Sequence, residues 1–362
     1  MYKAPRFANL ATTMNTANAE EAITFAQGLD LIAEEFTLRS IVLNDNVLDT
    51  NVEDADMTID GTHLITAEGF RDLCGILKIP NKFADVIPVD LLYHNIKRLI
   101  GEDIPLPDTK ILRRLDNVVA TVVKEPYKEI GYPDIITTFA ANAIINISVS
   151  ERLLKLTYLM EGASTISNNT DDYDVTISVI SSLTKAFKMY AVVGLAHVGS
   201  GASILLPFLG KTPGNYNIKD DQERLLRLSD SAGFILDVDA YENLKENFVH
   251  MKEDMLSKSE AMNIFKALAE LVGTADAETT LGMGEELRDL YKSEVKLYTS
   301  ALRKSKLLGL NAPELEMSEF KAVKFMNSVA KLSLGTAGEV LVSLGNLSGK
   351  ILFNSLVRQS MT

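Results

Sequence analysis

The residues best suited to chemistry in this chain are lysines and arginines gathered in two short stretches. The first, residues 110–128, lies in an otherwise acidic half and includes a tyrosine, and the second is residues 292–306. Cations in such clusters neutralise the phosphates of nucleic acids, and an aromatic ring among them can stack on a base. We therefore predict nucleic-acid contacts at Lys110, Arg113, Arg114, Lys124, Tyr127, Lys128, Lys292, Lys296, Arg303, Lys304 and Lys306.

The same clusters have a second interpretation, because lysines on a helix commonly form only its solvated face. Residues 1–180 carry a net charge of −12 and residues 181–362 a net charge of −1. A basic surface on the second half would then dock the acidic half of a neighbouring copy. The chain as a whole carries −13, so net charge alone would not bring it to nucleic acid or to an anionic membrane.

The spacing of the other reactive residues shows no catalytic or metal-binding pattern. The four histidines, at positions 63, 94, 197 and 250, are scattered, and we expect each to be a packed or surface side chain. Cys74 is the only cysteine and falls on the apolar face of a predicted helix, so an inert thiol is expected. The sequence from Gly194 to Gly199 has the gap of a phosphate loop but lacks its lysine. We predict no catalytic residue, no metal and no cofactor.

An acidic run at residues 171–174 reads Asp-Asp-Tyr-Asp. Its carboxylates suit a hard cation, but the run lacks the glycine and the distal glutamate of a calcium loop. We expect a solvated turn here, within a polar loop that ends at Asp174.

Composition and length describe an ordinary globular protein of about two domains. Of 362 residues, 46% are hydrophobic and 23% are charged, which excludes wholesale disorder. The uncharged stretch from Met189 to Gly210 contains four glycines and Pro207, so it predicts buried strands joined by a turn and no membrane span. With one cysteine and no apolar leader, the chain is expected in a reducing cytoplasm, without a membrane partner.

The periodicity predicts an α+β fold in which a mixed strand and helix part precedes an all-helical part. We expect a polar arm and an amphipathic helix in residues 1–36, with the helix running from Glu20 to Phe36, an α+β domain in residues 37–215, and a helical domain in residues 216–362. Gly345 and Gly349, four residues apart, predict a close helix contact.

Several segments resemble an uncharacterised phage/plasmid-like protein family, a domain of unknown function found in bacteriophages and mobile elements. The similarity lies in the helix and proline from Ile65 to Pro80, in Leu91, Leu92 and Asn95, in the strand from Val118 that ends at Tyr127 and Lys128, and in the segments 320–330 and 349–352. The resemblance implies a phage or mobile-element context inside a bacterial host.

Together these observations predict a non-enzymatic, phage-type accessory protein. We expect it to bind nucleic acid, single-stranded DNA above all, in replication or recombination and as a homo-oligomer. The alternative is a structural or interaction protein that assembles through complementary acidic and basic halves or engages a host protein. An enzyme built from dispersed carboxylates is a third hypothesis.

Overall fold

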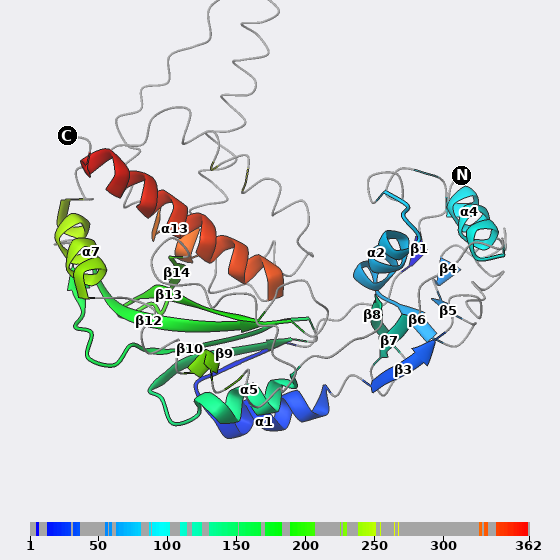
Figure 1. Ribbon diagram of the computed structural model, residues 1–362, viewed down its shortest axis with the longest axis horizontal. Coiled ribbons are helices and arrows are strands. Elements are labelled where there is room, and N and C mark those ends of the chain that lie inside the picture. Colours follow the sequence, from blue (N-terminus) through cyan, green and yellow to red (C-terminus); the bar gives the residue numbers. More distant parts are fainter. Residues whose placement is uncertain are drawn as a thin grey trace, which may run out of the picture.

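The computed structural model describes a little more than half of the chain. The described residues are 5–6, 13–29, 32–36, 55–56, 58–59, 63–80, 87, 89–101, 109–113, 118–124, 130–150, 152–167, 171–182, 189–206, 225, 227–229, 238–250, 254, 264, 267, 326–327, 329–331 and 338–360. They form two larger sheets at opposite ends of the long axis, each with its own helices (Figure 1). The fold is α+β, as the sequence predicts.

The larger sheet has seven strands in the order β14-β13-β12-β10-β9-β2, with β11 paired to the start of β12. All of these pairings are antiparallel. The strands are β2 (Thr13–Thr16), β9 (Ile144–Ser150), β10 (Leu154–Leu159), β11 (Ile166–Ser167), β12 (Asp172–Ser181), β13 (Tyr190–His197) and β14 (Ser203–Leu205). The predicted buried strands and turn in the uncharged stretch are therefore confirmed as β13, residues 198–200 and β14.

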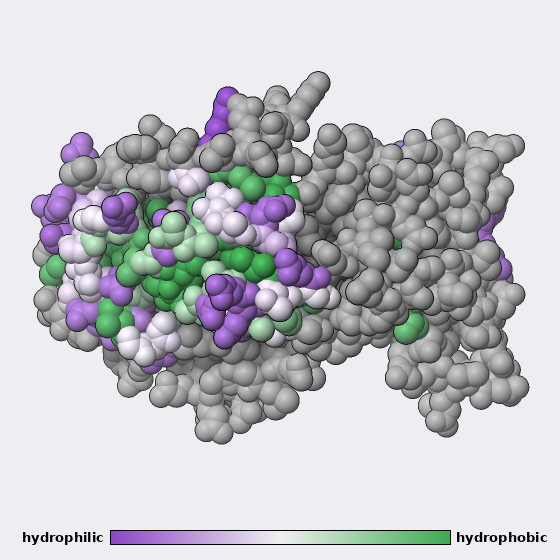
Figure 2. Space-filling view, turned by 90° about the horizontal axis from the view of Figure 1, so that it is seen from below, coloured by the Kyte–Doolittle hydropathy of each residue, from purple (hydrophilic) through white to green (hydrophobic). Residues whose placement is uncertain are grey.

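One face of this sheet is apolar and is covered by α1 (Ala19–Gly28) and α5 (Tyr132–Phe139). Alternate residues of a strand point to the same face, which places Leu156, Ile177 and Val193 in this core. The Phe139 and Tyr158 rings stack with centroids 5.8 Å apart. Seen from below, the surface of this lobe shows apolar residues in its middle and hydrophilic residues around them (Figure 2).

The opposite face of the sheet carries buried polar side chains beside an apolar cluster of Ile180, Val192 and Leu205. The polar residues include Ser148, Lys155, Thr157, Thr176 and Ser178, all less than 5% exposed. The Lys155 ammonium donates a hydrogen bond of 2.9 Å to Ser203 Oγ on β14. Lys155 pairs with Ile180 near the end of β12. Ser203 pairs with Ala196, which pairs with Asp174 near the start of β12. These two positions are roughly 20 Å apart along an extended strand. The sheet must therefore curl toward this face, and the curvature of β12 is visible in Figure 1.

Helix α13 (Gly338–Ser360) packs against β14, on the opposite side of the sheet from α1 and α5 (Figure 1). A Cβ on Gly349 would lie 1.7 Å from the carbonyl oxygen of Leu205, and one on Gly345 would lie 2.8 Å from Leu205 Cγ. The predicted close contact at these glycines is confirmed, with a strand rather than a helix as the partner.

The smaller sheet has five strands in the order β3-β7-β8-β6-β5, in which only the β6–β8 pairing is parallel. Helix α2 (Ala67–Ile76) packs on β8 (Val118–Lys124). Its first turn is capped by Thr66 Oγ1, which accepts a 2.9 Å hydrogen bond from the Gly69 amide. Cys74 is fully buried on this helix. The elements are β3 (Ile32–Phe36), β5 (Thr58–Ile59), β6 (His63–Ile65), α2 (Ala67–Ile76), α4 (Val89–Gly101), β7 (Thr109–Arg113) and β8 (Val118–Lys124), beside a small parallel pair of β1 (Pro5–Arg6) and β4 (Ala55–Asp56).

The predicted helix from Glu20 to Phe36 is wrong in its second half. Helix α1 ends at Gly28, and Ile32–Phe36 forms β3 instead. Antiparallel pairing with the neighbouring β7, such as Phe36 with Thr109, supplies backbone hydrogen bonds that outweigh the local helical periodicity.

In residues 216–362 the described residues other than Asp254 are helical, among them α7 (Val238–His250) and α13. The remaining residues of that part, and the predicted boundary near residue 215, lie outside the described residues, so the all-helical part stays a prediction. Within the described part of the chain, no helix combines the length and the apolar character needed to cross a membrane.

Replacing Gly349 by alanine should destabilise the protein, because the added methyl group would overlap a backbone oxygen that cannot rotate away. We expect a loss of about 1–3 kcal/mol in the free energy of unfolding, measured by urea denaturation. Gly75→Ala is the matched control: this glycine of α2 has no atom near its Cβ position, so alanine should be stabilising by about 0.5–1 kcal/mol. Equal effects of both variants would contradict the close contact.

Candidate functional site

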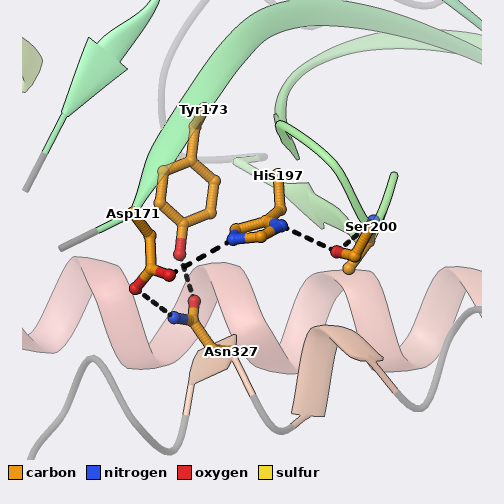
Figure 3. Close-up of polar contacts among 6 residues, drawn as sticks. Asp171, Tyr173, His197, Ser200 and Asn327 are labelled. Atoms are coloured by element: carbon orange, nitrogen blue, oxygen red, sulfur yellow. Dashed lines mark hydrogen bonds and ion pairs between the residues drawn. The ribbon is translucent and has the colours of Figure 1, made fainter.

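A chain of hydrogen-bonded polar side chains lies where β12 begins and β13 ends (Figure 3). Tyr173 on β12 and His197 on β13 lie directly opposite each other in the antiparallel pair, so their side chains share one face of the sheet. Asp171 precedes β12, Ser200 lies in the turn between β13 and β14, and Asn327 belongs to a helical segment distant in sequence. The fold therefore brings three separate parts of the chain to one point, which we call the polar network.

The hydrogen bonds of the polar network converge on the Asp171 carboxylate from two sides. His197 Nε2 lies 3.3 Å from Asp171 Oδ1, and His197 Nδ1 lies 2.8 Å from Ser200 Oγ. Asn327 Nδ2 donates a 3.0 Å bond to the second carboxylate oxygen, Asp171 Oδ2. Because a carboxylate only accepts, Asp171 places the imidazole proton on Nε2, and Ser200 then donates its hydroxyl proton toward the bare Nδ1.

Tyr173 anchors the other end of the polar network. Its hydroxyl donates to Asn327 Oδ1, and its ring meets those of His197 and Phe248 edge-on, with centroids 5.3 and 5.2 Å away. Burial, and then the Asp171 carboxylate, raise the pKa of Tyr173, so the phenol stays protonated and remains a donor. The imidazole is thus fixed by its ring contact with Tyr173 and by hydrogen bonds at both nitrogens.

The solvated turn expected at residues 171–174 is wrong, because β12 begins at Asp172 and Tyr173 is fully buried. Pairing with β13 continues to His197, and burial of the tyrosine ring stabilises that extension. No cluster of potential metal ligands occurs among the residues for which the structure gives positions.

Sequence reasoning missed the polar network, because Asp171 and His197 are 26 residues apart. The one local signal was a histidine followed three residues later by a serine between two glycines.

Lys155 is a second unusual group, because its ammonium is buried and no described carboxylate pairs with it. Its hydrogen bond to Ser203 is its one polar contact within the described part of the chain, and burial lowers its pKa from 10.5 to about 8. Thr157 Oγ1 and Ser178 Oγ are 3.0 Å apart on the same face, while Thr176 Oγ1 has no hydrogen-bond partner among the described residues. The buried face therefore carries a desolvation cost at Lys155 and at Thr176.

A cavity of about 430 Å³ lies between the end of α2 and α4, within the size range of small-molecule sites. Its polar lining is Lys78, Asn95 and Arg98, all on the surface, and its apolar lining is Leu77, Ile79, Pro80 and Leu99. We call this the α2–α4 pocket.

Lys78 lies at the rim of the α2–α4 pocket in a left-handed conformation, with φ of 60°. The Lys78 amide donates to the Gly75 carbonyl and the Ile79 amide donates to the Cys74 carbonyl, which ends α2 in a Schellman motif. Glycine is favoured at this position, because a side chain there costs about 1 kcal/mol. Lys78 is the one non-glycine residue with positive φ in the part of the chain that the structure describes.

The predicted nucleic-acid contacts are only partly within the described residues. Lys110 and Arg113 belong to β7 and Lys124 to β8; Lys110 pairs with Val123, and Lys124 with Thr109. Their strands therefore belong to the sheet that carries α2. The other predicted contacts lie outside the described residues: Arg114, Tyr127, Lys128, Lys292, Lys296, Arg303, Lys304 and Lys306.

Comparisons with protein-family models, curated proteins and solved structures found no match for this chain. The phage/plasmid-like resemblance therefore stays a hypothesis, and function has to be argued from the geometry alone.

Replacing Lys155 by methionine should change how stability depends on pH. Because the folded-state pKa is below the unfolded value, the unfolded chain binds more protons between pH 8 and 10.5. The wild type should therefore gain about 3 kcal/mol in unfolding free energy as pH rises through that window, relative to Lys155→Met. Urea denaturation at pH 7, 9 and 10.5 measures the difference, and a constant difference would contradict a buried ammonium.

Proposed function

We propose that this protein binds single-stranded nucleic acid, and that the α2–α4 pocket and the exposed side of α4 form its contact surface. The observation that carries the proposal is Lys78, a cation held in an unfavourable backbone conformation at the rim of an apolar-floored pocket. Local strain that persists at a surface position is commonly tied to function. Here Lys78 and Arg98 line the same pocket, so two positive charges are available to one ligand.

The pocket offers two kinds of contact that a nucleotide needs. Lys78 and Arg98 supply positive charge for a phosphate. Leu77, Ile79 and Pro80 supply an apolar surface on which a base can pack. Asn95 adds an amide that donates and accepts hydrogen bonds.

Helix α4 extends this surface beyond the pocket. Its buried side carries Leu92 and Ile96, whereas His94, Lys97 and Arg98 are exposed. A cationic helix face of this kind can follow a phosphate backbone although the whole chain is acidic. Leu91, 51% exposed on the same side, adds an apolar contact typical of unpaired bases rather than of duplex grooves.

The cations predicted on the β7–β8 pair and in residues 292–306 remain further candidate contacts for the same ligand. With self-association, neighbouring copies would then cover a longer stretch of strand. This supports an accessory role in replication or recombination, with single-stranded DNA as the ligand.

Lys78→Gly gives the sharpest test, because it should raise stability while it lowers affinity. Relief of the left-handed strain should add about 1 kcal/mol to the unfolding free energy, and loss of the cation should weaken binding roughly tenfold. Fluorescence anisotropy with a labelled oligothymidylate at low salt measures affinity, and urea denaturation measures stability.

Arg98→Ala should weaken binding and lower the slope of log K against log salt by about 0.7, the value for one phosphate contact on a single strand. Lys245→Ala is the matched control, since Lys245 is an exposed lysine on α7 near Glu242. Wild-type affinity in the Lys78 and Arg98 variants, or no binding by the wild type at micromolar protein, would overturn the proposal.

A further inference from the structure

The turn between β13 and β14 presents Ser200 in a fixed position. Gly199 and Gly201 on either side have left-handed φ values of 95° and 70°, which other residues rarely adopt. The Gly201 amide donates to the His197 carbonyl, and the His197 amide donates to the Ala202 carbonyl, both at 2.9 Å. The serine hydroxyl is therefore held at its distance from the imidazole by the backbone.

Ser200, His197 and Asp171 have the relations of an activated nucleophile, its base and the group that orients the base. Nucleophile and base are 2.8 Å apart, and base and carboxylate 3.3 Å. This arrangement is the general requirement for a reactive hydroxyl, whatever the fold that supplies it. The two imidazole nitrogens have exchanged partners relative to the familiar serine triad, with the serine on Nδ1 and the carboxylate on Nε2.

The surroundings of the polar network suit a reacting group better than a purely structural one. The His197 and Asp171 side chains remain 21% and 29% exposed, and Ser200 is half-buried. The Ala202 amide donates a 3.3 Å hydrogen bond to Ser200 Oγ, so the hydroxyl oxygen is held in place while its proton is directed to the imidazole. Asn327 donates to the Asp171 carboxylate and is itself held by the Tyr173 hydroxyl, so the carboxylate that orients the imidazole is fixed in turn.

We propose that Ser200 is a nucleophile toward activated carboxylic esters, with His197 as its general base and Asp171 as a positioning residue. His197 Nδ1 takes the hydroxyl proton while Ser200 Oγ bonds to the ester carbonyl carbon. The bond from that carbon to the leaving oxygen then breaks, and the leaving group takes the proton from Nδ1. Water, deprotonated in the same way, attacks the acyl-serine and releases the carboxylic acid, which restores the hydroxyl.

This chemistry adds an activity to the binding role and departs from the non-enzymatic protein expected from the sequence. It is independent of the α2–α4 pocket, because no residue is shared between the two sites. Failure of either proposal therefore leaves the other standing.

A fluorophosphonate probe tests the nucleophile directly, because Ser200 Oγ would displace fluoride and form a stable bond to phosphorus. Mass spectrometry of proteolytic peptides from the labelled wild-type chain should place the label on Ser200. Ser200→Ala should abolish it, and His197→Gln should slow it at least roughly a hundredfold. Ser164→Ala, which removes an exposed serine hydroxyl bonded to Tyr241, should label like the wild type.

A structural role for the same network would give different results. Asp171→Asn should alter the dependence of the labelling rate on pH, because the imidazole would lose its carboxylate partner. Ser200→Cys should react with iodoacetamide faster than Ser164→Cys, since only the former thiol would lie beside an imidazole. No label on Ser200 in the folded wild type, or equal thiol rates, would overturn the proposal; circular dichroism checks the fold of each variant.

Discussion

The pairing of β12 with β13 is the constraint on which the rest of the larger sheet depends. It sets Tyr173 opposite His197, and Asp171, two residues before, therefore reaches the imidazole. A shift of one residue would turn Tyr173 to the other face and separate these groups. The same pairing places Gly194 beside Thr176, where a Cβ would lie only 2.9 Å from the threonine hydroxyl. Glycine at this position is thus part of what holds the register.

The buried Lys155 goes with the curvature of the larger sheet, and its desolvation lowers the stability of the fold. Lys155 reaches across this face to Ser203, three residues beyond Ser200, so the contact also holds the strand that follows the Ser200 turn. A buried ammonium with one neutral partner is costly compared with an apolar side chain of similar size. Helix α13 packs against the curled end of the sheet at β14. Its glycines Gly345 and Gly349 let the helix approach the Leu205 backbone.

The sequence predicts local elements well and their long-range neighbours poorly. The helix that carries Cys74 and the buried strands and turn of residues 189–210 follow from periodicity and turn residues. Residues 32–36 were misread, because their partner β7 lies more than seventy residues away. The polar network escaped prediction for the same reason: Asp171, His197 and Asn327 meet only through tertiary packing. The strain at Lys78 depends on a backbone angle that composition does not reveal.

The molecule thus has a pocket with a cationic and apolar lining between α2 and α4. It also has a serine–histidine–carboxylate network on its larger sheet. The central claim is that the β12–β13 register commits the His197 proton to Nε2, which leaves Nδ1 as an acceptor for Ser200. Nitrogen-15 NMR of the folded protein at neutral pH measures the tautomer of this imidazole. We expect a protonated Nε2 coupled to its ring hydrogens and an unprotonated Nδ1. A proton found on Nδ1 of the neutral ring would contradict it.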